Sequence, residues 1–208
     1  MIKKARSILL LGFAVSLQGF AASPYVGVSG GITDPIDAKL TNRGITVGEL
    51  EQKTGVVFEG VVGLSYKSLP IRTEFAFSRM KSSLETLVLE ESTGKTRRPI
   101  HGEIVVSTLM ANLHYDIETG TPFTPYLSAG AGGAQISIEI DGISTWSDLV
   151  FAAQAGGGIA YKISPSLSLD LSYKYMVSDS TSAELVDGLP VSVKYNGHTI
   201  QFGLRYTF

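Results

Sequence analysis

Three histidines are the first candidates for chemistry in this 208-residue chain, because histidine is both a common general base and a common metal ligand. They are His101, His114 and His198. Their spacing contains neither His-x-His nor His-x-x-x-His, and the chain has no cysteine, so the sequence predicts no metal site. A hydrolase needs a base set against its nucleophile and oriented by a third group. The spacing shows no such set, so we expect no enzymatic activity.

Clustered glycines suggest a different chemistry, the binding of phosphate by a glycine-rich loop. The clusters are Gly130 to Gly133 and Gly156 to Gly158. Neither matches G-x-G-x-x-G or G-x-x-x-x-G-K-[ST]. Glycine in neighbouring β-strands relieves crowding and allows tight curvature, so we interpret both clusters as structural and expect no cofactor.

The first 22 residues have the organisation of a secretory signal peptide. Lys3, Lys4 and Arg6 precede an apolar stretch from Ile8 to Leu17, and Phe20-Ala21-Ala22 offers small residues for cleavage. The apolar core is too short to span a bilayer. We therefore predict a cleaved leader over residues 1–22 and one domain over residues 23–208. Of the 17 basic residues 14 then remain, against 19 acidic ones, which argues against nucleic acid as a partner.

The rest of the chain alternates polar and apolar residues with period two, most clearly at its C-terminus. One face of that segment has Ile200, Phe202, Leu204, Tyr206 and Phe208, and the other has Thr199, Gln201, Gly203, Arg205 and Thr207. Long apolar faces with aromatic residues toward their ends are typical of strands whose one face meets lipid and whose other face meets a lumen. The pattern predicts an all-β fold, an eight-stranded antiparallel up-and-down transmembrane β-barrel. Its strands are expected at 24–31, 56–67, 70–81, 102–116, 124–138, 150–163, 166–177 and 197–208.

The expected connections alternate in length, with short periplasmic turns and four longer external loops, at 32–55, 82–101, 139–149 and 178–196. Within the loops, Leu84 to Leu89 and Val191 to Tyr195 still alternate and predict strand extensions. Thr46 to Glu49 fits the capping box of a short helix. In the strand at 124–138 the apolar residues change from odd to even positions, which predicts a bulge at Gly132-Gly133.

Seven charged residues are assigned to the lumen. The interior of an eight-stranded barrel is just wide enough for side chains to fill it, and unpaired charges there are costly. We therefore expect ion pairs and hydrogen bonds between strands, with Arg205 paired to Glu74 or Glu59, and favour a polar plug over a conduit for ions. The seven are Glu59, Arg72, Glu74, Lys162, Asp170, Lys174 and Arg205.

Two further groups of residues are assigned to surfaces. Lys95, Arg97 and Arg98 form a dense basic patch in an external loop, where they could meet lipopolysaccharide phosphates or a polyanionic host surface. The alternative is a patch neutralised by nearby glutamates of the same hairpin. Aromatic residues near strand ends are interpreted as interfacial belts: Tyr25, Tyr66, Tyr115, Tyr126, Tyr161, Tyr173, Tyr175 and Tyr206.

Three segments resemble the superfamily of small outer-membrane β-barrels that includes OmpA-like, OmpX-like, opacity-type and rickettsial surface-antigen proteins. They are Thr124 to Gly132, Phe151 to Tyr175 with the turn Ile163-Ser164-Pro165, and His198 to Phe208. The resemblance implies location in the outer membrane, contact with lipid and lipopolysaccharide, and delivery by periplasmic chaperones and the barrel-assembly machinery. Phe208, with Tyr206, would be the assembly signal.

The expected function is therefore non-enzymatic. The barrel would anchor four external loops that carry adhesion, interaction or antigenic roles, with a host or envelope molecule as the ligand. The alternative is a narrow porin-like channel for ions or small solutes.

Overall fold

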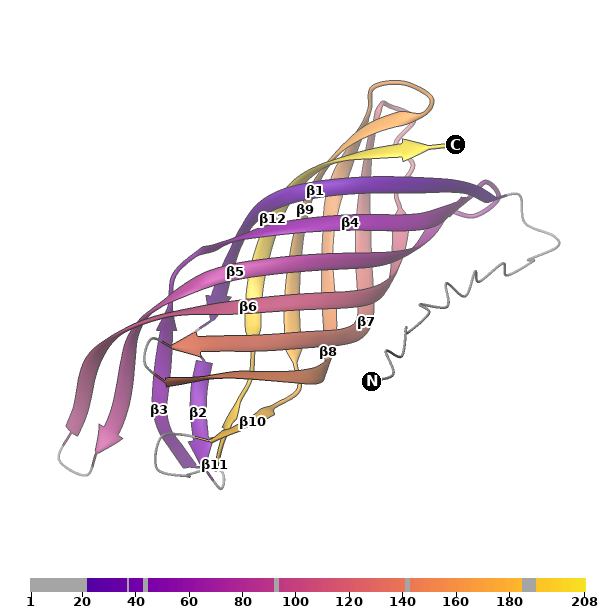
Figure 1. Cartoon of the computed structure of the whole chain (residues 1–208). Coiled ribbons are helices and arrows are strands. Elements are labelled where there is room, and N and C mark those ends of the chain that lie inside the picture. The colour runs from indigo at the N-terminus through magenta and orange to yellow at the C-terminus, as the bar shows by residue number, and fades with distance from the viewer. Residues whose placement is uncertain (1–21, 37, 43–44, 92–93, 141–142, 185–189) are drawn as a thin grey trace, which may run out of the picture.

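Twelve β-strands form the described part of the computed structural model, which comprises residues 22–36, 38–42, 45–91, 94–140, 143–184 and 190–208. None of the described residues form a helix long and apolar enough to cross a membrane. The predicted leader lies outside the described residues except for Ala22, so it stays a prediction. Eight strands form the barrel in Figure 1: β1 (Ala22–Ile36), β4 (Gly55–Tyr66), β5 (Ile71–Glu91), β6 (Gly94–Asp116), β7 (Phe123–Ile140), β8 (Ile143–Lys162), β9 (Leu167–Ser178) and β12 (Asn196–Thr207).

The barrel is closed by antiparallel pairing around its whole circumference. The order is β1-β4-β5-β6-β7-β8-β9-β12, and β12 returns to pair with β1 through twelve successive residue pairs from Tyr25–Thr207 to Ile36–Asn196. Closure leaves no free sheet edge within the barrel wall, so every backbone group there has a neighbouring strand to pair with. The eight predicted strands and the fold class are confirmed.

Side chains on each barrel strand alternate between the outer surface and the interior, as the pleat of a β-strand requires. Outward-facing Val28, Phe58 and Phe202 are 67%, 69% and 57% exposed, whereas inward-facing Val57 and Gln201 are each 1% exposed. The outer face is an apolar band, with Tyr115, Phe123, Tyr161, Tyr206 and Phe208 exposed at one end of the strands. This is the pattern that a barrel surrounded by lipid requires.

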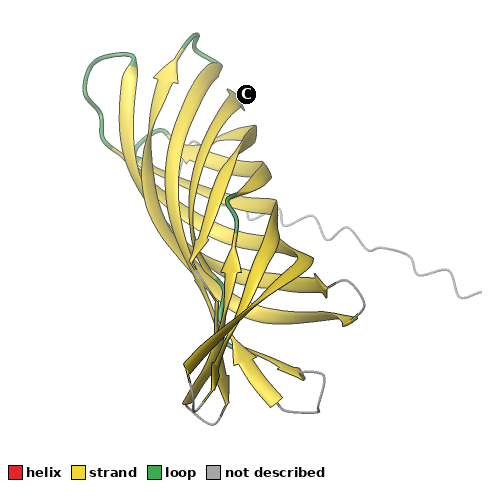
Figure 2. Ribbon diagram, turned by 90° about the vertical axis from the view of Figure 1, so that its left-hand side faces the viewer, coloured by secondary structure: helices red, strands yellow, loops and turns green. Residues whose placement is uncertain are grey.

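One end of the barrel carries short turns, and both ends of the described chain lie at that end. The turns connect β4 to β5, β6 to β7 and β8 to β9; we call this the short-turn end, and it is at the top of Figure 2 with the C-terminus. In the β6–β7 turn Gly120 has a φ of +69°, which favours glycine. The hydroxyl of Thr121 accepts a hydrogen bond from the backbone N–H of Phe123 at 3.2 Å.

At the opposite end the strands continue well beyond the barrel and join into one projecting sheet. It contains the outer parts of β5 and β6 together with β2 (Ala38–Asn42), β3 (Ile45–Gln52), β10 (Thr181–Glu184) and β11 (Pro190–Val193), in the order β10-β11-β2-β3-β5-β6. Figure 1 shows these strands at the lower left and bottom. The extension predicted at Leu84 to Leu89 is confirmed, and the one at Val191 to Tyr195 is confirmed as far as Val193. The helix predicted at Thr46 to Glu49 is wrong, because β3 pairs there with both β2 and β5.

The bulge predicted at Gly132-Gly133 is also wrong. The register of β7 with β6 and with β8 runs through Gly132 and Gly133 without a shift. The apolar residues change parity because the interior changes character along the barrel axis. Ile136 and Ile138 face inward, at 2% and 8% exposure, whereas Leu127 nearer the short-turn end faces outward at 61%.

The interior of the barrel at its outer end is therefore mostly apolar, with buried hydroxyl side chains such as Thr33, Ser78 and Thr108 among the apolar ones. Thirteen buried residues form one cluster there, which we call the apolar plug. It consists of Val57, Met80, Leu84, Ile104, Val106, Met110, Ala134, Ile136, Ile138, Val150, Ala152, Met176 and Tyr195. Tyr195 belongs to the segment between β11 and β12, and its backbone is held to Ser178 by hydrogen bonds in both directions. The plug fills the interior between the polar layers and the projecting sheet.

Candidate functional site

The interior near the short-turn end is polar and is organised around Arg72. Its guanidinium donates two hydrogen bonds of 2.8 Å to the carboxylate of Asp116 on the neighbouring strand, one from Nε and one from Nη2. The same guanidinium lies 4.8 Å from the ring centre of Tyr126 and 5.9 Å from that of Tyr25. Arg72 is thus held by a bidentate ion pair and by two aromatic rings, an arrangement that suits arginine better than lysine.

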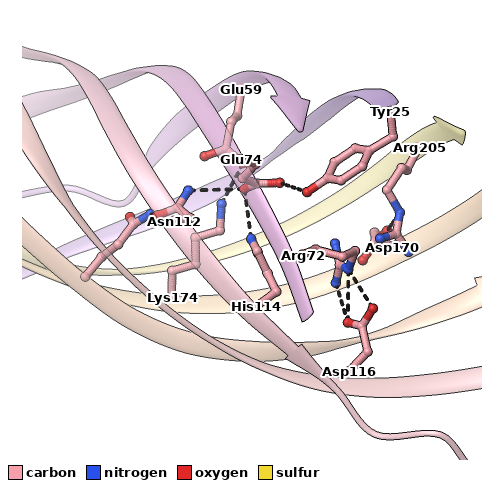
Figure 3. A network of polar contacts seen from close by, with 11 residues as sticks. Tyr25, Glu59, Arg72, Glu74, Asn112, His114, Asp116, Asp170, Lys174 and Arg205 are labelled. Atoms are coloured by element: carbon pink, nitrogen blue, oxygen red, sulfur yellow. Dashed lines mark hydrogen bonds and ion pairs between the residues drawn. The ribbon is translucent and has the colours of Figure 1, made fainter. Parts of the chain in front are cut away.

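One layer deeper, Glu74 is the centre of a hydrogen-bond network shown in Figure 3. Its carboxylate accepts hydrogen bonds from Tyr25 Oη at 2.9 Å and from Asn112 Nδ2 at 3.1 Å, and His114 Nε2 lies 3.0 Å from Oε1. Gln154 Nε2 donates in turn to Asn112 Oδ1 at 2.8 Å. The network joins β1, β5, β6 and β8, so each buried polar group stabilises the relative position of several strands.

Two more ion pairs balance the remaining interior charges. Lys174 Nζ lies 2.5 Å from Glu59 Oε1 and spans the lumen, because β9 and β4 are separated by two strands in the sheet order. Arg205 Nε lies 3.4 Å from Asp170 Oδ2 on the adjacent strand β9. Acidic and basic groups are therefore matched across the interior, which offsets part of the cost of burying them.

The structure places six of the seven residues assigned to the lumen in these networks. The seventh, Lys162, is exposed at the mouth of the short-turn end. The partners of Arg205 differ from those expected, because the strand stagger places it beside Asp170 and brings Lys174 to Glu59. Sequence reasoning also missed several network members. The available signal was their position on the strand face opposite the apolar, outward-facing residues of the same strand; they are Tyr25, Asn112, His114, Asp116, Tyr126 and Gln154.

Tyr25 and Tyr126 do not belong to an interfacial belt, because both are buried in the interior, at 1% and 6% exposure. Each ring lies beside a glycine, its register partner on the neighbouring strand. A Cβ at Gly63 would lie 2.4 Å from the Tyr25 ring, and one at Gly158 would lie 2.6 Å from the Tyr126 hydroxyl. These glycines leave the room that the two rings occupy, which agrees with a structural role for the Gly156 to Gly158 cluster.

The open space inside the barrel is small and lies toward the short-turn end. A cavity of about 50 Å³ is lined by charged residues of the networks, including Glu59, Glu74, His114 and Lys174. A wider vestibule of about 400 Å³ opens at the mouth, beside Arg72, Asp116 and Lys162. Among the described residues, no group of three or more His, Cys, Asp or Glu side chains is placed to hold a metal ion. The described interior thus contains ion pairs, a small polar cavity and an apolar plug.

The projecting sheet has an edge at β6. Residues 94–101 of β6 pair with β5, and the pairing of β6 with β7 begins at Gly102, so within the described strands this segment has one neighbour. The basic patch lies on it. The register sets Lys95 opposite Glu90, but sets Arg97 and Arg98 opposite Val88 and Leu87. Arg97 is exposed.

The closing strand ends beside β1. Phe208 donates a backbone hydrogen bond of 2.9 Å to the carbonyl of Pro24, and its ring lies 5.2 Å from that of Tyr206 in an edge-to-face arrangement. Both rings are exposed on the outer surface at the short-turn end. They are placed where another protein could reach them from that side.

A family model described as the outer membrane protein beta-barrel domain matches residues 7–208. The chain belongs to this family. Membership places the barrel in the outer membrane, in agreement with its apolar outer band. In outer-membrane barrels the short turns are periplasmic and the longer connections extracellular.

Among similar proteins is the outer membrane protein PagN of Salmonella typhimurium, which is 29% identical over 158 residues, 64% of this chain and 62% of PagN. The chain thus spans less than two thirds of that relative. Solved structures that resemble the barrel include the following two. Neisserial surface protein A has a TM-score of 0.57 at 19% identity, over 90% of this chain and 99% of its own. OprG of Pseudomonas aeruginosa has 0.63 at 12% identity, over 89% and 96%. At these identities the two structures show the fold alone.

Proposed function

We propose that this outer-membrane barrel is a non-enzymatic anchor that presents its extracellular sheet to molecules outside the cell. The observation that carries the proposal is the contrast between the two ends. The interior is occupied by ion pairs and the apolar plug, while the extracellular strands form an extended surface with an edge at residues 94–101. An open sheet edge is a template for interaction unless it is protected, and charged residues and proline are common protecting features. Here the edge contains Lys95, Arg97, Arg98 and Pro99, which disfavour pairing with another strand and leave positive charge as the feature for a ligand to recognise.

A polyanion is the ligand that the chemistry of this edge favours. Arg97 and Arg98 follow Lys95 on this edge, and arginine side chains bind sulfate and phosphate groups through bidentate hydrogen bonds. A sulfated polysaccharide or a phosphorylated envelope polymer has both the charge and the extended shape. A sheet outside the cell could bind such a polymer on another surface and would be accessible to antibodies.

Removing the two arginines tests the ligand class. Arg97→Gln/Arg98→Gln in the intact, folded barrel is expected to weaken binding to an immobilised sulfated polysaccharide by about 2- to 30-fold, because exposed ion contacts contribute roughly 0.2–1 kcal/mol each. The measurement is a binding isotherm at physiological salt. Lys67→Gln/Lys162→Gln removes the same charge from the periplasmic end and is the matched control. Equal weakening in both variants, or in neither, contradicts the assignment.

The apolar plug makes the channel alternative less favourable. Met110 and Ile136 are 1% and 2% exposed and lie in the interior between the polar layers and the extracellular side, and ions cross apolar constrictions of this kind poorly. We expect no reproducible unitary conductance when the purified barrel is inserted into planar bilayers. A stable, reproducible conductance step in the wild-type protein would contradict the anchor proposal.

Two parts of the delivery route stay predictions. The leader over residues 1–22 is expected to be removed after export, and Phe208 with Tyr206 is expected to be recognised by the barrel-assembly machinery after transport by periplasmic chaperones. The exposed position of both rings at the periplasmic end supports the second of these.

A further inference from the structure

The apolar plug has one member that the barrel strands do not carry. Twelve of its thirteen residues lie on β4, β5, β6, β7, β8 or β9, whereas Tyr195 lies in the segment between β11 and β12. Tyr195 is nevertheless buried, at 3% exposure. Because β11 belongs to the projecting sheet and β12 to the barrel, the position of Tyr195 depends on both.

The other plug residues leave one side of the interior to small and polar side chains. None of the described plug residues lies on β1 or β12. Val57 of the plug pairs in register with Gly31 on β1, and Met176 pairs with Gly197 on β12, so these two strands pass the plug at its own level. Three successive inward-facing pairs of β1 and β12 lie there, and we call them the seam lane: Gly31–Gln201, Thr33–Thr199 and Pro35–Gly197.

The inner end of the seam lane meets the polar cavity. Ser29 and Gly203 form the next inward-facing register pair, and both line that cavity. Arg72 and Arg205 line the cavity and the vestibule alike, so the polar space continues to the mouth at the short-turn end. Within the lane Gln201 is 1% exposed, and among the described residues neither its Oε1 nor its Nε2 has a hydrogen-bond partner. A buried amide needs polar partners, and water from the cavity can supply them.

Tyr195 closes the outer end of the seam lane. Its hydroxyl is hydrogen-bonded to the side chain of Thr33, and a Cβ built at Gly197 would lie 3.5 Å from the same oxygen. Its backbone forms two hydrogen bonds of 3.0 Å with Ser178. The ring thus occupies the side of the interior that β1 and β12 leave open. Thr33 is 0% exposed, so the lane is sealed while the ring is in place.

We propose that Tyr195 is the gate of a path for water and small ions that runs along the seam lane, from the vestibule to the extracellular side. When the ring leaves, glycine, threonine and glutamine line the path in place of an apolar constriction, and a polar lining of this kind stays hydrated. The Lys174–Glu59 pair connects β9 and β4 across the seam, and both residues line the cavity, so an ion meets charged groups there. Tyr195 follows β11 by two residues, so displacement of the projecting sheet is transmitted to the gate.

The test uses the absence of cysteine from the chain, because a single introduced thiol then reports access to the lane. Gln201→Cys is prepared in the intact barrel, alone and combined with Tyr195→Ala, and its modification by a small methanethiosulfonate reagent is followed by mass spectrometry in detergent micelles. Tyr195→Ala is expected to speed modification by about tenfold or more, since the rate follows the population of the open state. Tyr195→Phe keeps the ring and is expected to leave modification slow.

Ile136→Ala in the Gln201→Cys barrel is the matched control, because it truncates a plug residue on β7, across the barrel from the seam. It is expected to leave modification slow, and equal acceleration by the two truncations overturns the gate. Fast modification of Gln201→Cys with Tyr195 in place also overturns it. Heat-dependent gel mobility checks that each variant is folded.

Planar-bilayer recording tests whether ions use the path. Tyr195→Ala, without the introduced thiol, is expected to show a reproducible unitary conductance that the wild type lacks. The same recording of Ile136→Ala is expected to stay silent. A folded Tyr195→Ala barrel that gives no conductance overturns the ion path.

Discussion

Lys174→Met is expected to lower the free energy of unfolding by about 3–5 kcal/mol, because it leaves the carboxylate of Glu59 buried without its cation. The Glu59 and Lys174 side chains are 9% and 12% exposed, so only the small polar cavity beside them could supply water in place of the lost partner. The pair also connects strands on different sides of the lumen, so its loss removes a direct link across the barrel. Urea titration in detergent micelles, followed by heat-dependent gel mobility, measures the change.

The double variant Glu59→Met/Lys174→Met separates the loss of the pair from the burial of an unpaired charge. Replacing both partners by apolar residues of similar size is often neutral or stabilising. We therefore expect the double variant to recover most of the stability that Lys174→Met loses. If the double variant is as unstable as the single one, the pair contributes through its geometry, and burial of a lone carboxylate is not the cause.

Ile136→Ala is expected to destabilise the barrel by about 2–5 kcal/mol, the range for truncating a buried aliphatic side chain and leaving a cavity. Ile136 is 2% exposed within the apolar plug, where its neighbours are held by the barrel wall and cannot collapse into the space. The same urea titration measures the effect. The prediction depends on the inward direction of this side chain, which the bulge predicted at Gly132-Gly133 would have placed outside.

Leu149→Ala is the matched control, because Leu149 is on the adjacent strand β8, opposite Gln135, but is 73% exposed on the outer surface. Lipid or detergent fills the space that this truncation leaves, so the transfer term of about 1–2 kcal/mol remains without a cavity term. A larger loss for Leu149→Ala than for Ile136→Ala would contradict the inside and outside faces assigned to β7 and β8.

The barrel itself was predictable because lipid on one side and a lumen on the other impose a period of two on each strand. The segment from Thr199 to Phe208 shows that pattern without interruption, and β12 occupies Asn196–Thr207. The pattern fails in β7, since an apolar residue is compatible with either lipid or an apolar interior. From the sequence, Ile136 and Ile138 were interpreted as evidence of a register shift. In the structure they mark the change from a polar to an apolar interior.

The interior network was predictable in part for a related reason. Glu59, Arg72 and Glu74 carry charge on strands whose other face is apolar, so their direction could be inferred. The partners could not, because the stagger between strands decides which layers meet, and alternation within one strand contains no information about stagger. Tyr25 and Tyr126 were misassigned for a different reason, since tyrosine suits both a membrane interface and a polar interior.

The extracellular segments were the least predictable part. Thr46 to Glu49 satisfies a local rule for helix capping, but β2 and β5 lie on either side of β3 and offer it backbone hydrogen bonds. Such non-local pairing overrides local preference, and the sequence of the segment alone does not show which strands will be its neighbours.

The joining of the extracellular strands into one sheet has a consequence for immune recognition. β11 pairs with β2 at Ser192–Thr41, and β3 pairs with β5, so backbone from the first, second and fourth external connections shares one hydrogen-bonded surface. An antibody raised against the folded barrel would therefore bind a composite epitope that no single-loop peptide reproduces. Insertions within these paired segments would shift the register of their neighbours, so antigenic variation is expected as side-chain substitution at constant length.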